Sequence, residues 1–158
     1  MSKGNVYDWE LLKENFKENN VKFCPASFDE IEFFQNKYDV KIPQDLRNYY
    51  SEINGSGNEI LSNLYKFYNI YSTKKVKEEL VNFRGVPDYS QLNFEGMENI
   101  FVFGESDFCL YAFGIELYQN SSYKNRIFIF CGGDFKIIAE SFTEFIDLYL
   151  TRPEEIHI

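Results

Sequence analysis

Histidine is almost absent from this sequence, and the only one, His157, lies in a tail that follows Pro153. A catalytic Ser–His or Cys–His pair needs a histidine that is fixed in a pocket, so this position argues against histidine catalysis. Cysteine is also scarce: Cys24, Cys109 and Cys131 are far apart and show no Cys-x-x-Cys spacing. We therefore expect reduced, buried thiols that fill space in the core, with no metal site and no cofactor.

Long apolar runs are missing as well. The longest ones, such as residues 127–131, have the length of a strand and are too short to cross a bilayer. Residues 1–6 contain no apolar run of the kind that a signal peptide carries. With 4 prolines and 9 glycines, no stretch resembles a linker. These absences predict a cytoplasmic protein with no membrane partner, folded as a single domain over residues 1–158.

Basic residues are few relative to acidic ones: 16 Lys and Arg stand against 25 Asp and Glu, which gives a formal net charge of −9. A negative field repels phosphate, so we expect no nucleic-acid binding. The same field attracts cationic partners where acids cluster, although acidity can also serve only to keep the protein soluble. The one dense basic cluster, Lys74, Lys75 and Lys77, is expected to be a solvated face near the start of a helix, with a local contact to an acidic partner as the alternative.

Aromatic residues, in contrast, are abundant, with 17 Phe and 12 Tyr, and they predict a packed core. Tyr65, Tyr68 and Tyr71 recur at every third position of a predicted strand. Successive side chains of a strand point to opposite faces, so these tyrosines cannot all share one face. Some of them should be exposed or lie in a groove.

Capping signals locate the helices. Ser27 is followed three residues later by Glu30, and Ser141 by Glu144, which is the pattern of a capping box. Pro43 fits the first position of another helix. Helices are expected over residues 8–19, 27–38, 43–53, 73–83 and 141–150. The fourth of them is expected to be capped by Thr73, to carry Val76, Leu80 and Phe83, and to end before Gly85 and Pro87. The apolar side of the second is expected to hold Phe28, Ile31, Phe34 and Tyr38.

Strands are expected where aromatic and β-branched residues concentrate, namely over residues 64–71, 100–103, 109–117, 126–130 and 135–139. Gly132 and Gly133 predict a hairpin turn before the last of them. Helices first, then an antiparallel meander, then a helix give an α+β fold with helices packed on a mostly antiparallel sheet. The continuous apolar runs 101–103 and 127–130 indicate central strands that are covered on both faces.

Several pieces of the chain, in this order, resemble the SUKH superfamily of Smi/Knr-like domains. The pieces are the helix 27–38, then Val40-Lys41-Ile42-Pro43-Gln44-Asp45-Leu46-Arg47-Asn48-Tyr49-Tyr50, Asn54-Gly55, Phe103-Gly104-Glu105-Ser106-Asp107, a glycine turn with a strand, and Ser141-Phe142-Thr143-Glu144-Phe145-Ile146. The resemblance covers roughly residues 8–151. Each piece also has a structural task of its own, so the pieces speak for the fold more than for the function.

The resemblance implies a binding role without catalysis. Many bacterial members of the superfamily are immunity proteins that neutralise toxins, often nucleases, and fungal relatives regulate cell-wall synthesis as interaction hubs. We therefore expect an immunity-type protein that binds a basic, cognate toxin stoichiometrically, with a regulatory scaffold as the alternative. A small hydrolase that uses paired carboxylates is the third possibility.

Loop acids and tyrosines are the candidate partner contacts. Acids opposite a cationic partner favour its encounter and binding, and tyrosine is a frequent interface anchor. The same acids can equally be solvated loop residues with no partner. The candidate set consists of Glu95, Glu98, Glu105, Asp107 and Asp134 as acidic contacts and Tyr111 and Tyr118 as anchors.

Overall fold

The computed structural model describes residues 8–79, 88–120 and 123–158. Within these ranges the chain forms five α-helices, three short 3-10 turns and a six-stranded sheet. The helices are α1 (Glu10–Glu18), α2 (Phe28–Tyr38), α3 (Gln44–Glu52), α4 (Val76–Glu79) and α5 (Phe142–Thr151). The strands are β1 (Tyr65–Phe67), β2 (Lys74–Lys75), β3 (Ile100–Ser106), β4 (Tyr111–Glu116), β5 (Ile127–Cys131) and β6 (Asp134–Ala139). None of the described helices is long and apolar enough to cross a membrane.

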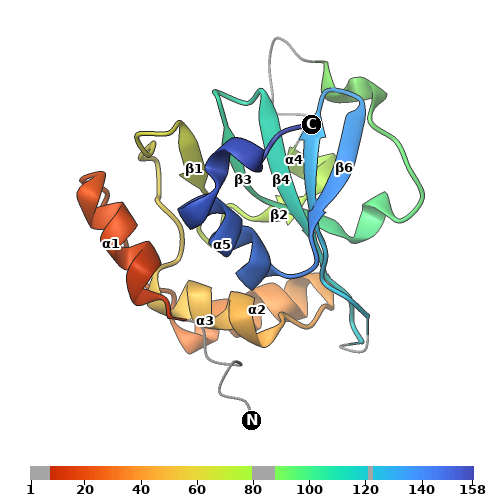
Figure 1. Cartoon of the computed structure of the whole chain (residues 1–158). Helices are drawn as coiled ribbons and strands as arrows, with labels where there is room; N and C mark the ends of the chain where they lie inside the picture. The colour runs from red at the N-terminus through yellow and green to blue at the C-terminus, as the bar shows by residue number, and fades with distance from the viewer. Residues whose placement is uncertain (1–7, 80–87, 121–122) are drawn as a thin grey trace.

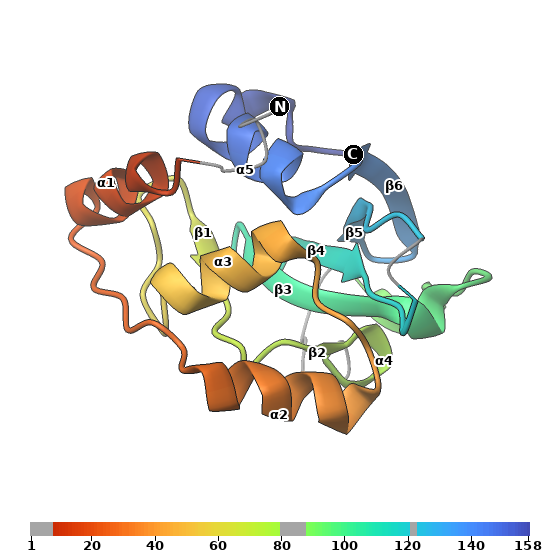
Figure 2. The same cartoon turned by 90° about the horizontal axis from the view of Figure 1, so that it is seen from below.

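All strand pairs of the sheet are antiparallel, and the order along it is β1-β3-β4-β5-β6. The short strand β2 pairs with β3 as well, farther along the edge that β1 also uses. Helices α1 and α5 lie over one face, α2 and α3 lie across the lower end of the sheet, and α4 lies on the other face (Figures 1 and 2). The α+β architecture predicted from the sequence is therefore confirmed.

Two apolar clusters cover the two faces of the sheet. The larger one joins α1, α2, α3 and α5 to β3 through side chains such as Phe101 and Phe103. The smaller one packs Val76 of α4 and the segment around Tyr89 against the other side of the same strand, including Val102. The prediction that central strands are buried on both faces is confirmed, since β3 is buried at every position except Glu105.

The starts of α2 and α5 follow the capping signals, with one difference between them. Ser27 Oγ accepts a hydrogen bond from the Glu30 N–H, and the Glu30 carboxylate accepts one from the Ser27 N–H. This capping box is therefore complete. At α5 the Ser141 side chain accepts from the Glu144 N–H, but the Glu144 carboxylate accepts from the N–H of residue 140. The second box is therefore only half formed, because the carboxylate reaches one residue farther back.

The segment after β1 corrects the sequence interpretation. The strand expected over residues 64–71 is limited to β1, and Lys74 and Lys75 form β2 where a helix was predicted to begin. Thr73 is not a helix cap: it is buried, and its hydroxyl lies 2.8 Å from the Tyr50 hydroxyl and 2.9 Å from the Asn69 carbonyl. The predicted helix positions Leu80, Phe83, Gly85 and Pro87 lie outside the described residues.

The boundary between β3 and β4 also differs from the prediction. Strand β3 continues through Gly104 to Ser106, with an irregularity between Val102 and Gly104, and β4 begins only at Tyr111. Gly104 had the appearance of a turn residue. Its actual role is close packing, because a Cβ atom there would lie 3.0 Å from the Lys66 carbonyl of the neighbouring strand β1.

Some aromatic side chains lie where the pattern placed them and others do not. Tyr65 and Tyr68 are buried in different clusters and Tyr71 is exposed, so the prediction that the three cannot share a face is confirmed. Phe28 is 69% exposed, although it was expected on the buried side of α2. It is the first residue of the helix, where the chain has not yet turned its apolar face to the core.

Gly55 and Gly57 follow α3 and differ in how closely the rest of the chain packs against them. Both have a left-handed backbone, with φ of +79° and +65°, but a Cβ at Gly55 would lie 2.6 Å from the Tyr68 carbonyl group while one at Gly57 meets nothing within 4 Å. We expect Gly55→Ala to lower the free energy of unfolding by roughly 2–5 kcal/mol, from conformation plus overlap. Gly57→Ala should cost only about 1–2 kcal/mol. Urea denaturation measures both, and equal losses would contradict the packing argument.

Candidate functional site

Four of the candidate contact residues gather at one end of the sheet. Glu105 lies near the end of β3, Asp107 follows it, Tyr111 begins β4 and Asp134 begins β6. The turns that join β3 to β4 and β5 to β6 lie together at the upper end of the sheet (Figure 1). The Tyr89 hydroxyl holds these turns together, because it lies 2.8 to 3.3 Å from the carbonyl oxygens of residues 109, 110 and 130.

The other three candidates lie elsewhere. Glu98 and Tyr118 line a shallow hollow at the opposite end of the sheet. The Tyr118 hydroxyl donates to Glu116 Oε2 at 2.8 Å, and Glu116 also pairs with Arg126 at 2.7 Å, so Tyr118 supports an ion pair of its own chain. Glu95 is exposed in the loop that precedes the 3-10 turn Met97–Asn99. The predicted set thus divides between separate surfaces.

The turn between β3 and β4 has an unusual backbone. Asp107, Phe108 and Cys109 are consecutive and all left-handed, with φ of 53°, 55° and 72°. For a residue other than glycine, this conformation costs about 1–2 kcal/mol of conformational free energy. Leu64 is left-handed too, and its carbonyl accepts from the Asp107 N–H at 3.1 Å. We call Leu64 and residues 107–110 the hairpin tip.

The hairpin tip displays apolar side chains to solvent. Phe108 is 72% exposed, and Leu64 and Leu110 are exposed as well. Backbone strain that is retained at a surface position commonly marks a functional segment. The sequence pattern did not single out Phe108, because a run of left-handed residues is normally signalled by glycine or asparagine and residues 108–110 contain neither.

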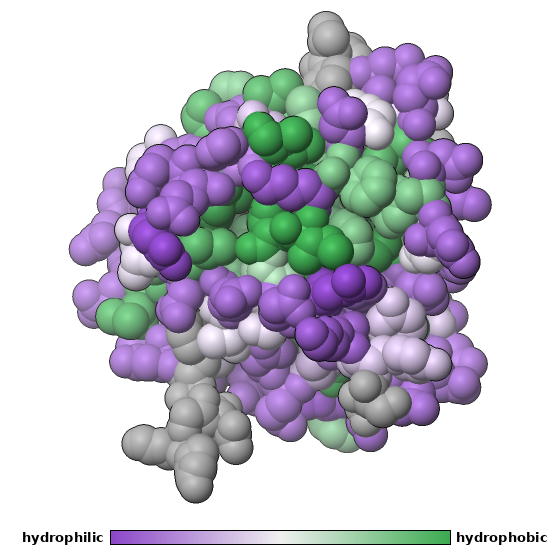
Figure 3. Space-filling view, turned by 45° about the vertical axis from the view of Figure 1, so that its right-hand side comes forward, coloured by the Kyte–Doolittle hydropathy of each residue, from purple (hydrophilic) through white to green (hydrophobic). Residues whose placement is uncertain are grey.

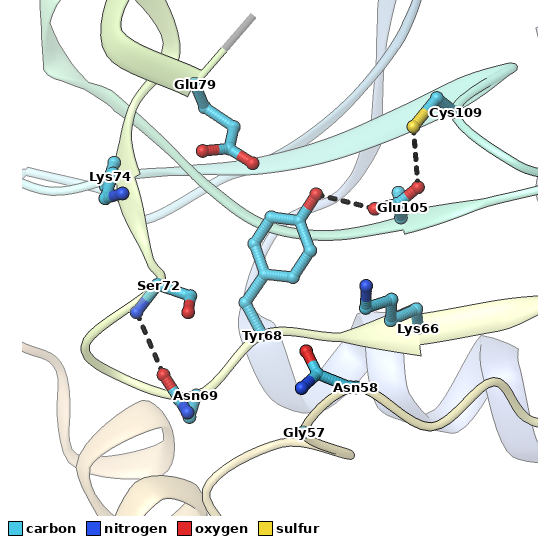
Figure 4. Close-up of a pocket in the computed structure, with 10 residues that line it drawn as sticks. All are labelled: Gly57, Asn58, Lys66, Tyr68, Asn69, Ser72, Lys74, Glu79, Glu105 and Cys109. Carbon is cyan, nitrogen blue, oxygen red and sulfur yellow. Dashed lines mark hydrogen bonds between the residues drawn. The ribbon is translucent and has the colours of Figure 1, made fainter. Parts of the chain in front are cut away.

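A pocket of about 360 Å³ opens beside the hairpin tip, on the face of the sheet that carries α4 (Figure 4). The Tyr68 ring forms its wall, and its hydroxyl donates to Glu105 Oε2 at 2.8 Å. Cys109 donates its thiol hydrogen to the other oxygen, Oε1, also at 2.8 Å. The pocket is lined by Gly57, Asn58, Lys66, Tyr68, Asn69, Ser72, Lys74, Glu79, Glu105 and Cys109.

Burial, and after it the acids of this pocket, keep Tyr68 and Cys109 protonated. Burial first, and then the charges of Glu105 and Glu79, raise the pKa of Tyr68 well above its ordinary value. Burial also raises the pKa of the Cys109 thiol, to about 12, together with the hydrogen bond to Glu105 and the charge of that carboxylate. A nucleophilic cysteine needs a lowered pKa, so Cys109 is not prepared for such chemistry. Glu105 has both oxygens engaged by its own chain.

The remaining candidates for chemistry are dispersed. Cys24 is exposed, which corrects the prediction of a buried thiol, because it lies in the loop between α1 and α2; Cys109 and Cys131 are half-buried. His157 is exposed in the tail. Within the described ranges, no three His, Cys, Asp or Glu side chains lie close enough together to hold a metal ion. Lys74 and Lys75 are half-buried in β2, so only Lys77 of the basic cluster fits the expected solvated helix face.

Three helices, an antiparallel sheet and a closing helix define an α+β domain of the Smi/Knr-like class. The model of the SMI1 / KNR4 family (SUKH-1) matches residues 25–148, which is most of the chain, and the chain belongs to this family. Its domain is thus an interaction module of the SMI1/KNR4 type, with another protein as its partner. A search of curated proteins found no significant match.

The contact between Cys109 and Glu105 gives a prediction about thiol reactivity. Replacing the carboxylate in Glu105→Gln removes a negative charge that opposes the thiolate, so the pKa of Cys109 should fall. A fall of one unit raises the thiolate fraction about tenfold, and we expect alkylation of Cys109 at pH 9 to accelerate by about three- to tenfold. Mass spectrometry after iodoacetamide treatment gives the rate for each cysteine. The exposed Cys24 is the internal control, and an unchanged rate at Cys109 would contradict the proposed contact.

Proposed function

We propose that this chain is an immunity-type protein that neutralises a cognate toxin by stoichiometric binding through the hairpin tip. The observation that carries the proposal is the presentation of Phe108, an exposed aromatic ring on a strained left-handed turn. Exposed aromatic side chains that enter a pocket of a partner are typical centres of binding energy. Family membership supports a protein partner, and the proposal adds what that partner is and where it binds.

The charges around the hairpin tip suit a basic partner. Asp107 belongs to the tip, Glu105 lies beside it and Asp134 lies at the same end of the sheet. Negative groups around an apolar anchor speed the encounter with a basic surface and orient it. The formal net charge of −9 acts in the same direction. Toxins that cut nucleic acid need a basic surface for their substrate, so an acidic protein that covers it would inhibit without any catalysis.

The regulatory scaffold is the second candidate, because the family match does not separate it from an immunity protein. Gene neighbourhood distinguishes them, since an immunity gene normally follows a large toxin gene. Co-expression with the product of the upstream gene should protect the host and yield an equimolar complex. Failure to protect, together with capture of cellular regulatory proteins, would favour the scaffold.

Catalysis by this chain is not part of the proposal. The pocket does bring Glu79 and Glu105 together, as a hydrolase with paired carboxylates requires. However, Glu105 accepts hydrogen bonds on both oxygens from Tyr68 and Cys109, which ties it to its own chain. An immunity protein acts by occupying the toxin, so activity of this chain alone on nucleic acid or peptide substrates should be absent.

The variant Phe108→Gly separates a binding role from a structural one. Glycine relieves the left-handed strain at the cost of a more flexible unfolded chain, so the free energy of unfolding should stay unchanged or rise by up to about 1 kcal/mol. Binding to the toxin should weaken at least about tenfold because the anchor is lost. Phe28→Ala, which removes an equally exposed ring from α2, is the matched control and should bind as the unmodified protein does. Loss of stability in Phe108→Gly with unchanged binding would refute the proposal.

Charge reversal tests the acidic part of the surface. Asp107→Lys should slow association and weaken binding by roughly 1–3 kcal/mol, with a smaller loss at high salt. Glu95→Lys makes the same change in net charge at a loop position away from the hairpin tip and should have little effect. Surface plasmon resonance at two salt concentrations gives both rate constants. An equal response of the two variants would assign the effect to net charge and remove Asp107 from the interface.

A further inference from the structure

Strand β6 forms an open edge of the sheet. It is the last strand in the order β1-β3-β4-β5-β6, and its neighbours are β5 on one side, α5 over one face and Phe94 over the other. In the part of the chain that the structure describes, every backbone hydrogen bond of β6 belongs to its ladder with β5. An edge of this kind offers unpaired N–H and C=O groups to another strand.

The hairpin register determines which residues carry the open groups. Gly132 and Gly133 form the turn, so Asp134, opposite Cys131, directs its backbone groups to β5. Since this direction alternates along an antiparallel strand, Lys136 also faces β5. Phe135 and Ile137 therefore present their N–H and C=O groups outward.

The same two residues expose apolar side chains. Phe135 is 42% exposed and Ile137 is 41% exposed. Both lie on the sheet face away from α5, where the Phe135 ring stacks on Phe94 with centroids 4.2 Å apart. Figure 3 brings the side of the molecule with β6 forward and shows hydrophobic residues exposed among hydrophilic ones on that side. Exposed apolar surface next to an open strand edge is typical of an interface.

We propose that β6 pairs with β6 of a second copy of this chain, antiparallel about a two-fold axis at Phe135. In this register Phe135 lies opposite Phe135 of the second copy, and Asp134 lies opposite Lys136 at both ends. Residues directly opposite in an antiparallel pair have side chains on the same face, close enough to form an ion pair. The strand is thus complementary to itself in both apolar and charged positions.

Charge selects this register over its neighbours. An axis at Lys136 places two lysines opposite each other, and an axis at Ile137 places Asp134 opposite Glu140. Both arrangements oppose like charges, which destabilises strand pairing. A lysine on an edge strand ordinarily discourages pairing with other chains. Here Asp134 supplies its counter-charge, so Lys136 specifies the partner strand instead of blocking it.

This inference does not depend on the toxin-binding proposal, because it concerns pairing of β6 with a second copy of the same chain, although Asp134 is named in both. An interface of one strand pair is small, so we expect a weak dimer whose population rises with protein concentration. Sedimentation equilibrium of the purified full-length chain over a wide concentration range measures it. A chain that stays monomeric throughout the range would overturn the proposal.

Charge reversal in pairs makes the test specific. Lys136→Asp and Asp134→Lys, each alone, oppose like charges across the axis and should raise the dimer dissociation constant at least about tenfold. Combining the two substitutions restores opposite charges and should return the constant to within about threefold of the original value. Lys22→Asp, an exposed lysine in the loop before α2, is the control for net charge and should leave dimerisation unchanged. Dimerisation that is insensitive to either single reversal would refute the pairing.

A cysteine at the axis tests the register. Residues that face each other in a hydrogen-bonded antiparallel pair have Cα atoms about 5.5 Å apart, within the range of a disulfide. Phe135→Cys in a Cys24→Ser background should therefore form a covalent dimer on mild oxidation, whereas Ile137→Cys should not. Crosslinking by Ile137→Cys alone would place the axis at Ile137 and overturn the register chosen by charge.

Discussion

Strand β3 determines the shape of the end of the domain that carries the hairpin tip. It pairs with β4 along one edge and with both β1 and β2 along the other. Because β1 and β2 follow each other in the chain and the Tyr68 N–H still donates to the Phe103 carbonyl of β3, residues 69–73 must leave the sheet between them and return. Asn69 stabilises this excursion by accepting from the N–H groups of Ser72 and Thr73. The pocket lies where the excursion leaves β3 uncovered, with Tyr68 as its wall.

Burial on both faces makes β3 rigid enough to carry a strained turn. On one face Phe103 packs against Phe142 and Phe145 of α5, with ring centroids 5.3 Å apart in each case. On the other face Val102 packs in the cluster that includes Tyr89. Apolar burial of this size outweighs the few kilocalories that the left-handed residues of the hairpin tip cost. The turn can therefore keep a conformation that its own sequence does not favour.

The sequence predicted those parts of the structure whose cause is local. Ser27 and Glu30 predict α2 because a capping box involves only residues of one turn. Gly132 and Gly133 predict the last hairpin because a tight turn is also formed by neighbouring residues. The end of β3 was predicted wrongly at Gly104, because the packing of this glycine against Lys66 of β1 depends on a neighbour far away in the chain. Lys74 and Lys75 carry no strand signal of their own and are strand residues only because β3 offers them an edge.

The candidate site followed the same rule. Glu105, Asp107, Tyr111 and Asp134 were recognised one at a time from their chemistry, but their common location results from the order of the strands. Glu98 and Tyr118 were chosen for the same chemical reasons, but they lie at the opposite end of the sheet. The pocket combines residues from Gly57 to Cys109, and no pattern within a short window could reveal it. Phe108 was not among the candidates because the features that distinguish it are its exposure and its backbone geometry, which composition does not report.

The left-handed run at the hairpin tip has a kinetic consequence. Residues other than glycine have only a small left-handed region available, so Asp107, Phe108 and Cys109 leave the turn far fewer backbone states than glycines would. A tip with so few backbone states would lose little conformational entropy on docking to a partner. A preorganised contact of this kind lengthens the lifetime of a complex more than it speeds its formation. In the toxin-binding role proposed above, slow release would keep the partner occupied.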